Sequence, residues 1–124
     1  MARRPTTPGL THLRVTVADD FYLGPGRADL LQFIAETGSI SAAGKRMDMS
    51  YKRAWGLVQA LNEGFGAPLV EASRGGSGQG GAVLTSAGQE ILRLYRNMEA
   101  AAALAIATDL KAAQALRDEQ SGRK

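Results

Sequence analysis

The chain has 124 residues, 44% of them hydrophobic, with a formal net charge of +3. This length suits one domain with one hydrophobic core plus an extension, and the mild positive charge suits a polyanionic partner. Because there is no cysteine and only one histidine, His12, disulfides, thiolate nucleophiles and cysteine-ligated zinc are excluded, and we expect no enzyme, cofactor or metal site.

Residues 1–12 contain Pro5, Pro8 and Gly9, so we expect this segment to be disordered or extended. It lacks the apolar stretch of a signal peptide, and no run in the chain approaches the roughly 18 apolar residues of a membrane span. We therefore expect a soluble, cytoplasmic protein with no membrane partner. Residues 13–17 alternate apolar and polar side chains with β-branched residues, which predicts a half-buried strand that needs a partner strand.

The centre of the chain predicts three helices. The first begins near Arg27 and ends at Gly38, because its apolar residues recur at helical spacing up to that point. Ser39 can cap a second helix and Ser50 a third, since a serine hydroxyl accepts from the free N–H groups of the first helical turn. With a tight turn at residues 48–49, the second and third helices predict a helix-turn-helix.

The third helix separates apolar from polar side chains. Its apolar face comprises Tyr51, Ala54, Trp55, Val58 and Leu61, so we expect Trp55 to be a core aromatic residue. Its polar face comprises Lys52, Gly56, Gln59 and Glu63, with Arg53 beside it. This arrangement is typical of a helix that lies in the DNA major groove. An ordinary helical hairpin with a solvated charged face is the alternative interpretation.

Two short strands are predicted at residues 69–73 and 82–85, joined by the glycine-rich residues 74–81. This β-hairpin, with Arg74 at the start of its tip, is typical of the wing of a winged helix. Residues 76–81 also match G-x-G-x-x-G. A dinucleotide site needs a helix directly after this motif, and a strand is predicted there instead, so we do not expect nucleotide binding.

A long last helix is predicted from Thr85 or Ser86 to about residue 117, with residues 86–89 fitting a capping box, and residues 118–124 are expected to be a disordered tail. A helix of about 46 Å outruns a domain with a radius of gyration of about 14 Å. Fraying in water is one outcome, but we expect its apolar stripes to meet a second copy. The predicted dimer interface is Ile91, Leu94, Tyr95, Met98, Ala101, Leu104, Ala105 and Ile106.

These elements predict a mostly α fold with a small β-sheet (α+β). It is a winged helix-turn-helix over residues 13–85, with an N-terminal strand and a long C-terminal dimerisation helix over residues 86–117. The amino end of the recognition helix meets base edges in this motif, and a glycine-rich wing can approach phosphates. The predicted DNA-binding residues are Ser39, Ser41, Lys45, Ser50, Tyr51, Lys52, Arg53, Gln59, Arg74, Ser77 and Gln79.

The sequence resembles the N-terminal DNA-binding domain of the ModE family, the molybdate-responsive bacterial regulators, which is similar to the winged helix of LysR-type regulators. The resemblance is carried by Gly38-Ser39-Ile40-Ser41, by Ser50-Tyr51-Lys52-Arg53-Ala54-Trp55 and by the glycine wing with its exit, residues 75–85. Gly56 departs from it, because relatives can carry an acidic residue there.

The resemblance implies a homodimeric transcriptional regulator that binds double-stranded DNA at an inverted-repeat operator and is linked to molybdenum genes. In that family molybdate binds to C-terminal domains, and the sequence stops at Lys124, so we expect no molybdate bound by this chain. A winged helix used as a protein-interaction module or antagonist, which pairs with a longer regulator, is the alternative.

Overall fold

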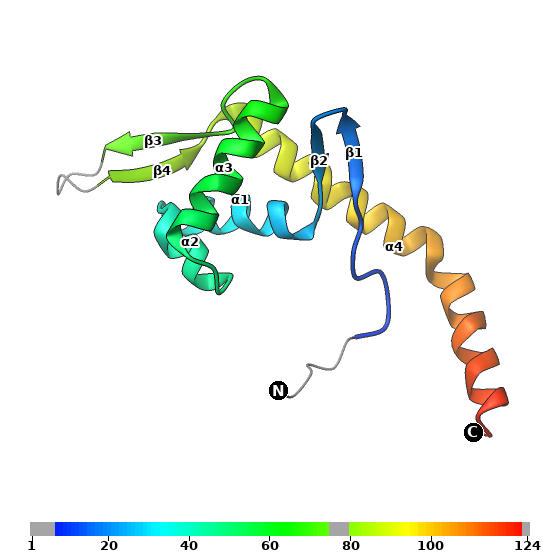
Figure 1. The fold of residues 1–124 in the computed structure, drawn as a ribbon. Helices are drawn as coiled ribbons and strands as arrows, with labels where there is room; N and C mark the ends of the chain where they lie inside the picture. Colours follow the sequence, from blue (N-terminus) through cyan, green and yellow to red (C-terminus); the bar gives the residue numbers. More distant parts are fainter. Residues whose placement is uncertain (1–6, 75–79, 123–124) are drawn as a thin grey trace.

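The computed structural model describes residues 7–74 and 80–122. Within these ranges it contains, in chain order, β1 (Val15–Ala18), β2 (Phe21–Leu23), α1 (Pro25–Thr37), α2 (Ile40–Arg46), α3 (Tyr51–Phe65), β3 (Val70–Arg74), β4 (Gly80–Leu84) and α4 (Ser86–Gln120). Figure 1 shows α1, α2 and α3 gathered at the centre, with the β3–β4 hairpin and the carboxyl end of α4 projecting in opposite directions. The predicted fold class, a mostly helical winged helix-turn-helix, is confirmed.

The predicted first strand finds its partner in β2, which the sequence pattern did not predict. The two strands are antiparallel, with Val15 opposite Leu23 and Thr16 opposite Tyr22. Phe21 and Leu23 point into the core and are almost fully buried, whereas Tyr22 between them lies on the other face. A strand of three residues is too short for alternation to be recognised in a sequence, although this short strand closes one side of the core.

The core lies where α1, α3, β2, the base of the β3–β4 hairpin and the first turns of α4 meet. Its largest fully buried side chains are Phe21, Leu23, Leu30, Leu31, Ile34, Val58, Leu61, Leu69 and Tyr95. Burying a side chain of this size contributes about 1.5–3 kcal/mol relative to leaving it exposed. Contributions from five separate elements therefore hold the helix-turn-helix to the rest of the domain.

The β3–β4 hairpin, hereafter the wing, is fixed at its base by one amide side chain of α3. The Asn62 Oδ1 accepts from the backbone N–H groups of Leu69 (2.8 Å) and Val70 (3.2 Å), and its Nδ2 donates to the Val70 carbonyl (3.0 Å). On the other strand, Ala82 N–H donates to the Gly38 carbonyl at 2.9 Å. Both strands of the wing are thus bonded to the helical core.

The start of α4 is set by Thr85 and not by the predicted capping box at residues 86–89. Thr85 Oγ1 accepts from Gly88 N–H at 3.0 Å and also donates to the Pro68 carbonyl at 2.8 Å. The prediction failed because the capping hydroxyl belongs to the residue just before the helix, and the serine that follows is already helical.

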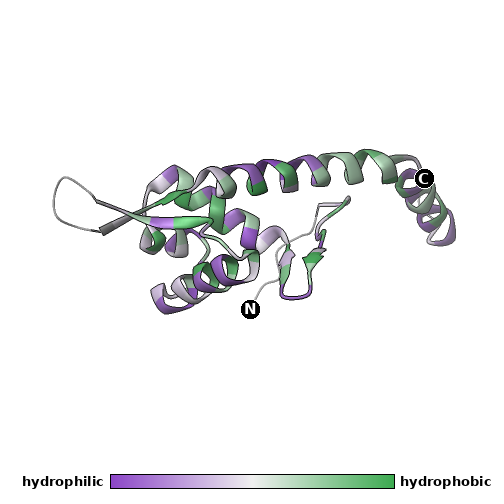
Figure 2. Cartoon of the chain, turned by 90° about the horizontal axis from the view of Figure 1, so that it is seen from above, coloured by the Kyte–Doolittle hydropathy of each residue, from purple (hydrophilic) through white to green (hydrophobic). Residues whose placement is uncertain are grey.

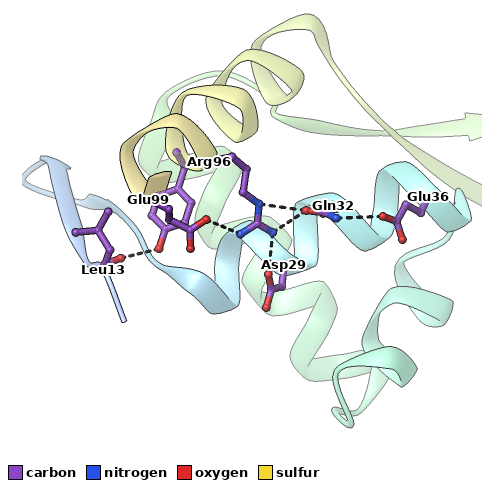
Figure 3. Close-up of polar contacts among 7 residues, drawn as sticks. Leu13, Asp29, Gln32, Glu36, Arg96 and Glu99 are labelled. Carbon is purple, nitrogen blue, oxygen red and sulfur yellow. Dashed lines mark hydrogen bonds and ion pairs between the residues drawn. The ribbon is translucent and has the colours of Figure 1, made fainter. Parts of the chain in front are cut away.

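Two neighbouring residues, about two and a half turns into α4, fix it to the rest of the domain. The Tyr95 hydroxyl donates to the Leu13 carbonyl at 2.7 Å. Next to it, Arg96 donates to Asp29 (2.8 Å) and Gln32 (2.7 Å) of α1, and to Glu99 (2.9 Å) on α4 itself (Figure 3). Burial raises the pKa of the Tyr95 hydroxyl above its ordinary value, so it stays protonated and able to donate at neutral pH.

Beyond these anchors α4 leaves the domain. Figure 2 shows it running along one side of the molecule and past the β1–β2 hairpin. The helix continues through Gln120, so it includes residues that were predicted to begin a disordered tail. Most side chains after residue 100 are exposed, although many of them are apolar. The outer part of α4 therefore has little tertiary packing within its own chain.

Candidate nucleic-acid interface

The helix-turn-helix is built as its serines predict. Ser39 Oγ accepts from Ala42 N–H at 3.0 Å and caps α2, and Ser50 Oγ accepts from Arg53 N–H at 3.1 Å and caps α3. The turn between them passes through Asp48 at φ 56°, a left-handed conformation that aspartate tolerates better than most residues. The two helix starts therefore have defined geometry before any ligand arrives.

The outer face of α3 presents polar side chains to solvent. Lys52 and Gln59 are exposed on this face, with Gly56 between them, and Lys45 is exposed near the end of α2. Within residues 7–74 and 80–122, neither lysine forms an ion pair with a carboxylate. Two cations without an internal partner therefore lie on or next to a helix face that has no other element covering it.

The apolar face of α3 is narrower than predicted. Ala54, Val58 and Leu61 are buried, but Tyr51 is 58% and Trp55 is 44% exposed. Ala54, Val58 and Leu61 already fill the space where α3 contacts the core. Tyr51 and Trp55, about one turn apart, lie on the side of α3 that faces the wing. They line an open groove of about 420 Å³ whose other walls are the first turn of α2 and the two wing strands. The prediction that Trp55 is a core residue is therefore wrong.

We expect Trp55→Ala to lower the free energy of unfolding by about 1–2 kcal/mol, because the indole is only about half buried. Truncating a fully buried tryptophan costs about 3–5 kcal/mol. Urea denaturation followed by far-UV circular dichroism measures the difference. A loss of about 5 kcal/mol, as for a fully buried tryptophan, would show that the indole belongs to the core.

The remaining predicted DNA-binding residues are placed as follows. Ser41 is exposed on the first turn of α2 and lines the groove together with Ser39 and Ile40. Arg74 is the last residue of β3 and pairs with Gly80 in the antiparallel register of the wing. The tip itself, with the predicted residues Ser77 and Gln79, lies outside the described residues. Arg53 is exposed, but it lies at the edge of the polar face, toward the β1–β2 hairpin.

Residues 27–89, which contain most of α1, all of α2 and α3, and the wing, match the family model described as bacterial regulatory helix-turn-helix protein, lysR family. The chain belongs to this family. Among solved structures, the CbnR DBD–DNA complex matches this lysR-family chain with a TM-score of 0.50 and 26% identity, over 79% of this chain and 97% of that chain.

This lysR-family chain is also similar to two curated proteins, one of which is named for binding a molybdenum pterin. The chain is 48% identical over 81 residues to the molybdenum-pterin-binding protein MopB of Rhodobacter capsulatus, covering 65% of this chain and 30% of that protein. It is 41% identical over 83 residues to the DNA-binding transcriptional dual regulator ModE of Escherichia coli K12, covering 67% and 32%. The predicted resemblance to ModE regulators is confirmed, and the chain spans about a third of the length of these relatives.

The lysR-family model leaves most of α4 unmatched, and one predicted interface residue there must be withdrawn. Tyr95 is fully buried inside its own chain and cannot face a second copy. Ile106 lines a hollow with Gly9 and Leu10 of the same chain, so part of its surface is already covered. The other predicted residues remain available: Ile91 is partly exposed, and Leu94, Met98, Ala101, Leu104 and Ala105 are exposed.

Across residues 7–74 and 80–122 there is no group of three or more histidine, cysteine, aspartate or glutamate side chains arranged to hold a metal ion. Among the same residues, no helix combines the length and apolar character needed to cross a membrane.

Proposed function

We propose that this protein is a homodimeric transcriptional regulator that binds double-stranded DNA sequence-specifically. The observation that carries the proposal is the uncovered face of α3. It bears Lys52 and Gln59, begins at a capped amino end, and lies between a wing on one flank and further arginines on the other. Membership of a regulatory helix-turn-helix family, and similarity to a DNA-bound domain, support the same function.

In the proposed complex α3 lies in the major groove. Lys52 is near its amino end, where lysine can donate to guanine O6 and N7, and Gln59 lies on the same face two turns on, where an amide can pair with adenine. Ser39, Ser41 and Ser50 are at helix starts, where hydroxyl and backbone N–H groups suit phosphate oxygens. Arg74 and the wing would meet the neighbouring backbone.

Dimerisation is proposed through α4. The side chains at 91, 94, 98, 101 and 105 recur at alternating steps of three and four residues, the spacing that lines one seam of paired helices. Small alanines along this seam allow close approach. A twofold dimer would present two copies of α3, so the preferred operator would be an inverted repeat. Its two half-sites would lie one or more helical turns apart, at about 34–36 Å per turn.

The target genes are proposed to serve molybdenum metabolism or transport, because the similar protein MopB is named as a molybdenum-pterin-binding protein and the ModE relative of Herbaspirillum seropedicae as a molybdenum transport protein. The regulator would act in the cytoplasm on the nucleoid and would catalyse no reaction. Molybdate itself is not proposed as a ligand of this chain. A selected-library binding experiment with the purified protein tests the central claim: enrichment of one palindromic sequence is expected, and binding without sequence preference would contradict it.

We expect Lys52→Ala to weaken binding to the selected operator at least tenfold while leaving the melting temperature unchanged, because Lys52 is exposed and a base contact is worth about 1–3 kcal/mol. Fluorescence anisotropy with labelled duplexes measures the affinity. Lys111→Ala, which removes an exposed lysine from α4, is the matched control and should bind normally. Equal affinity of both variants would show that this face of α3 does not meet the bases.

A further inference from the structure

The arginines of the described residues divide into two groups. Those that pair with a carboxylate are Arg46, Arg93, Arg96 and Arg117. The other three with described side chains, Arg14, Arg27 and Arg53, have no carboxylate partner in that part of the chain. All three line one hollow of about 230 Å³ on the flank of α3 opposite the wing. Unpaired positive charges that lie close together repel one another, and this repulsion costs free energy unless an anion binds to them.

Two of these arginines are held in place by one aromatic ring. The Arg14 Cζ lies 3.7 Å and the Arg27 Cζ 3.9 Å from the centroid of the Tyr22 ring. Both guanidinium groups therefore pack against this one phenol ring. Arg27 is further fixed because its Nη1 donates to the Tyr22 carbonyl at 3.2 Å.

Stacking of this kind occupies the face of a guanidinium group and leaves N–H groups at its edge, although in Arg27 one of them already donates to the Tyr22 carbonyl. A guanidinium packed on a ring uses its face, so N–H groups in its plane stay available for the bidentate contacts that arginine makes with phosphate. The buried Arg27 Nε has no hydrogen-bond partner among the described atoms. No acidic residue lines the hollow, whose other walls are His12, Met47, Met49 and Leu57 besides the turn before α1.

We infer that this hollow is a second DNA-backbone site, in which Arg14, Arg27 and Arg53 hold a phosphate of the strand that borders the major groove. The inference rests on the proposed function. Arg53 connects the hollow to α3, so a duplex lying along the polar face of α3 would bring one backbone to the wing and the other to this site. Arg14 precedes the residues of the family model, which begin at Arg27. The β1–β2 hairpin thus adds a contact that the winged helix alone lacks.

The test measures affinity against salt concentration for Arg14→Gln and Arg27→Gln, with Arg93→Gln as the control. Each of the first two variants should weaken binding to operator and random duplex alike, by roughly tenfold, and make the log–log salt slope shallower by about one unit. The control should match the wild type. Thermal melts check folding, and a purely structural role for the arginines would lower the melting temperature without changing the slope.

A second arm locates the contact on DNA. Operators with a single neutral methylphosphonate should bind the wild type roughly tenfold more weakly at one backbone position per half-site, and the Arg14→Gln/Arg27→Gln double variant should be insensitive there. Equal sensitivity of the double variant would overturn the inference while the proposed function stands. Saturable binding of inorganic phosphate, with DNA affinity unchanged in the variants, would assign the hollow to a small phosphate ligand instead. A wild-type chain that binds no duplex would remove both proposals.

Discussion

The double variant Ala101→Glu/Ala105→Glu is expected to sediment as a monomer and to lose at least a hundredfold in affinity for a two-half-site operator. Both alanines are exposed on the α4 seam, and in a dimer the new carboxylates would be buried against the partner helix without a counter-charge. A monomer loses the effective concentration that links two half-sites, which is worth about 10²- to 10⁴-fold. Sedimentation equilibrium and anisotropy measure the two effects.

Ala100→Glu is the matched control for this variant. It makes the same change in the same helix, on an exposed residue that lies away from the seam, so it should remain dimeric and bind normally. The melting temperature of the seam variant at low protein concentration should equal that of the wild type at the same concentration, because neither alanine packs on its own core. A seam variant that stays dimeric would place the dimer contact elsewhere.

Gly88→Ala is expected to destabilise the fold by about 1–3 kcal/mol, although alanine is the better helix former. A Cβ built on Gly88 would meet the carbonyl oxygen of Leu69 and lie 3.0 Å from its carbonyl carbon. This backbone cannot give way without breaking the 2.9 Å bond from Thr85 N–H to the Leu69 carbonyl. Chemical denaturation measures the loss.

The same substitution at Gly56 should have the opposite sign. Gly56 lies in the interior of α3, is exposed, and a Cβ there would meet nothing within 4 Å. Alanine should therefore raise the free energy of unfolding by about 1 kcal/mol through helix propensity alone. If both glycine variants were stabilised, the close approach of α4 to Leu69, the residue before β3, would be wrong.

Local signals in the sequence predicted the helix-turn-helix and the wing well. The hydroxyls of Ser39 and Ser50 cap the two helices as expected, and the wing strands fall within two residues of their predicted positions. These features depend on neighbours within a few residues, which a sequence displays directly. The exposed polar face of α3 follows from the same short-range periodicity.

What the sequence could not predict depends on contacts between distant residues. The periodicity of α3 groups Trp55 with the apolar residues of the helix. Whether its side chain is buried depends on the space left in the core, and it stays exposed. Tyr95 shares a stripe with exposed residues of α4, yet its hydroxyl reaches Leu13, which is 82 positions away. The packing of Arg14 and Arg27 on Tyr22 joins the residue before β1, a residue of β2 and the start of α1, and no spacing in the sequence indicates it.

The bonds from Asn62 to the base of the wing have a consequence for the DNA. Because this side chain of α3 holds Leu69 and Val70, the base of the wing and α3 form one unit. In the proposed complex such a unit would keep the distance between its groove contact and its backbone contact fixed, so the duplex would have to adopt the matching groove width and curvature. Sequences that deform easily between the contacted bases should then bind more tightly, and the protein would distinguish base steps it never touches by their flexibility.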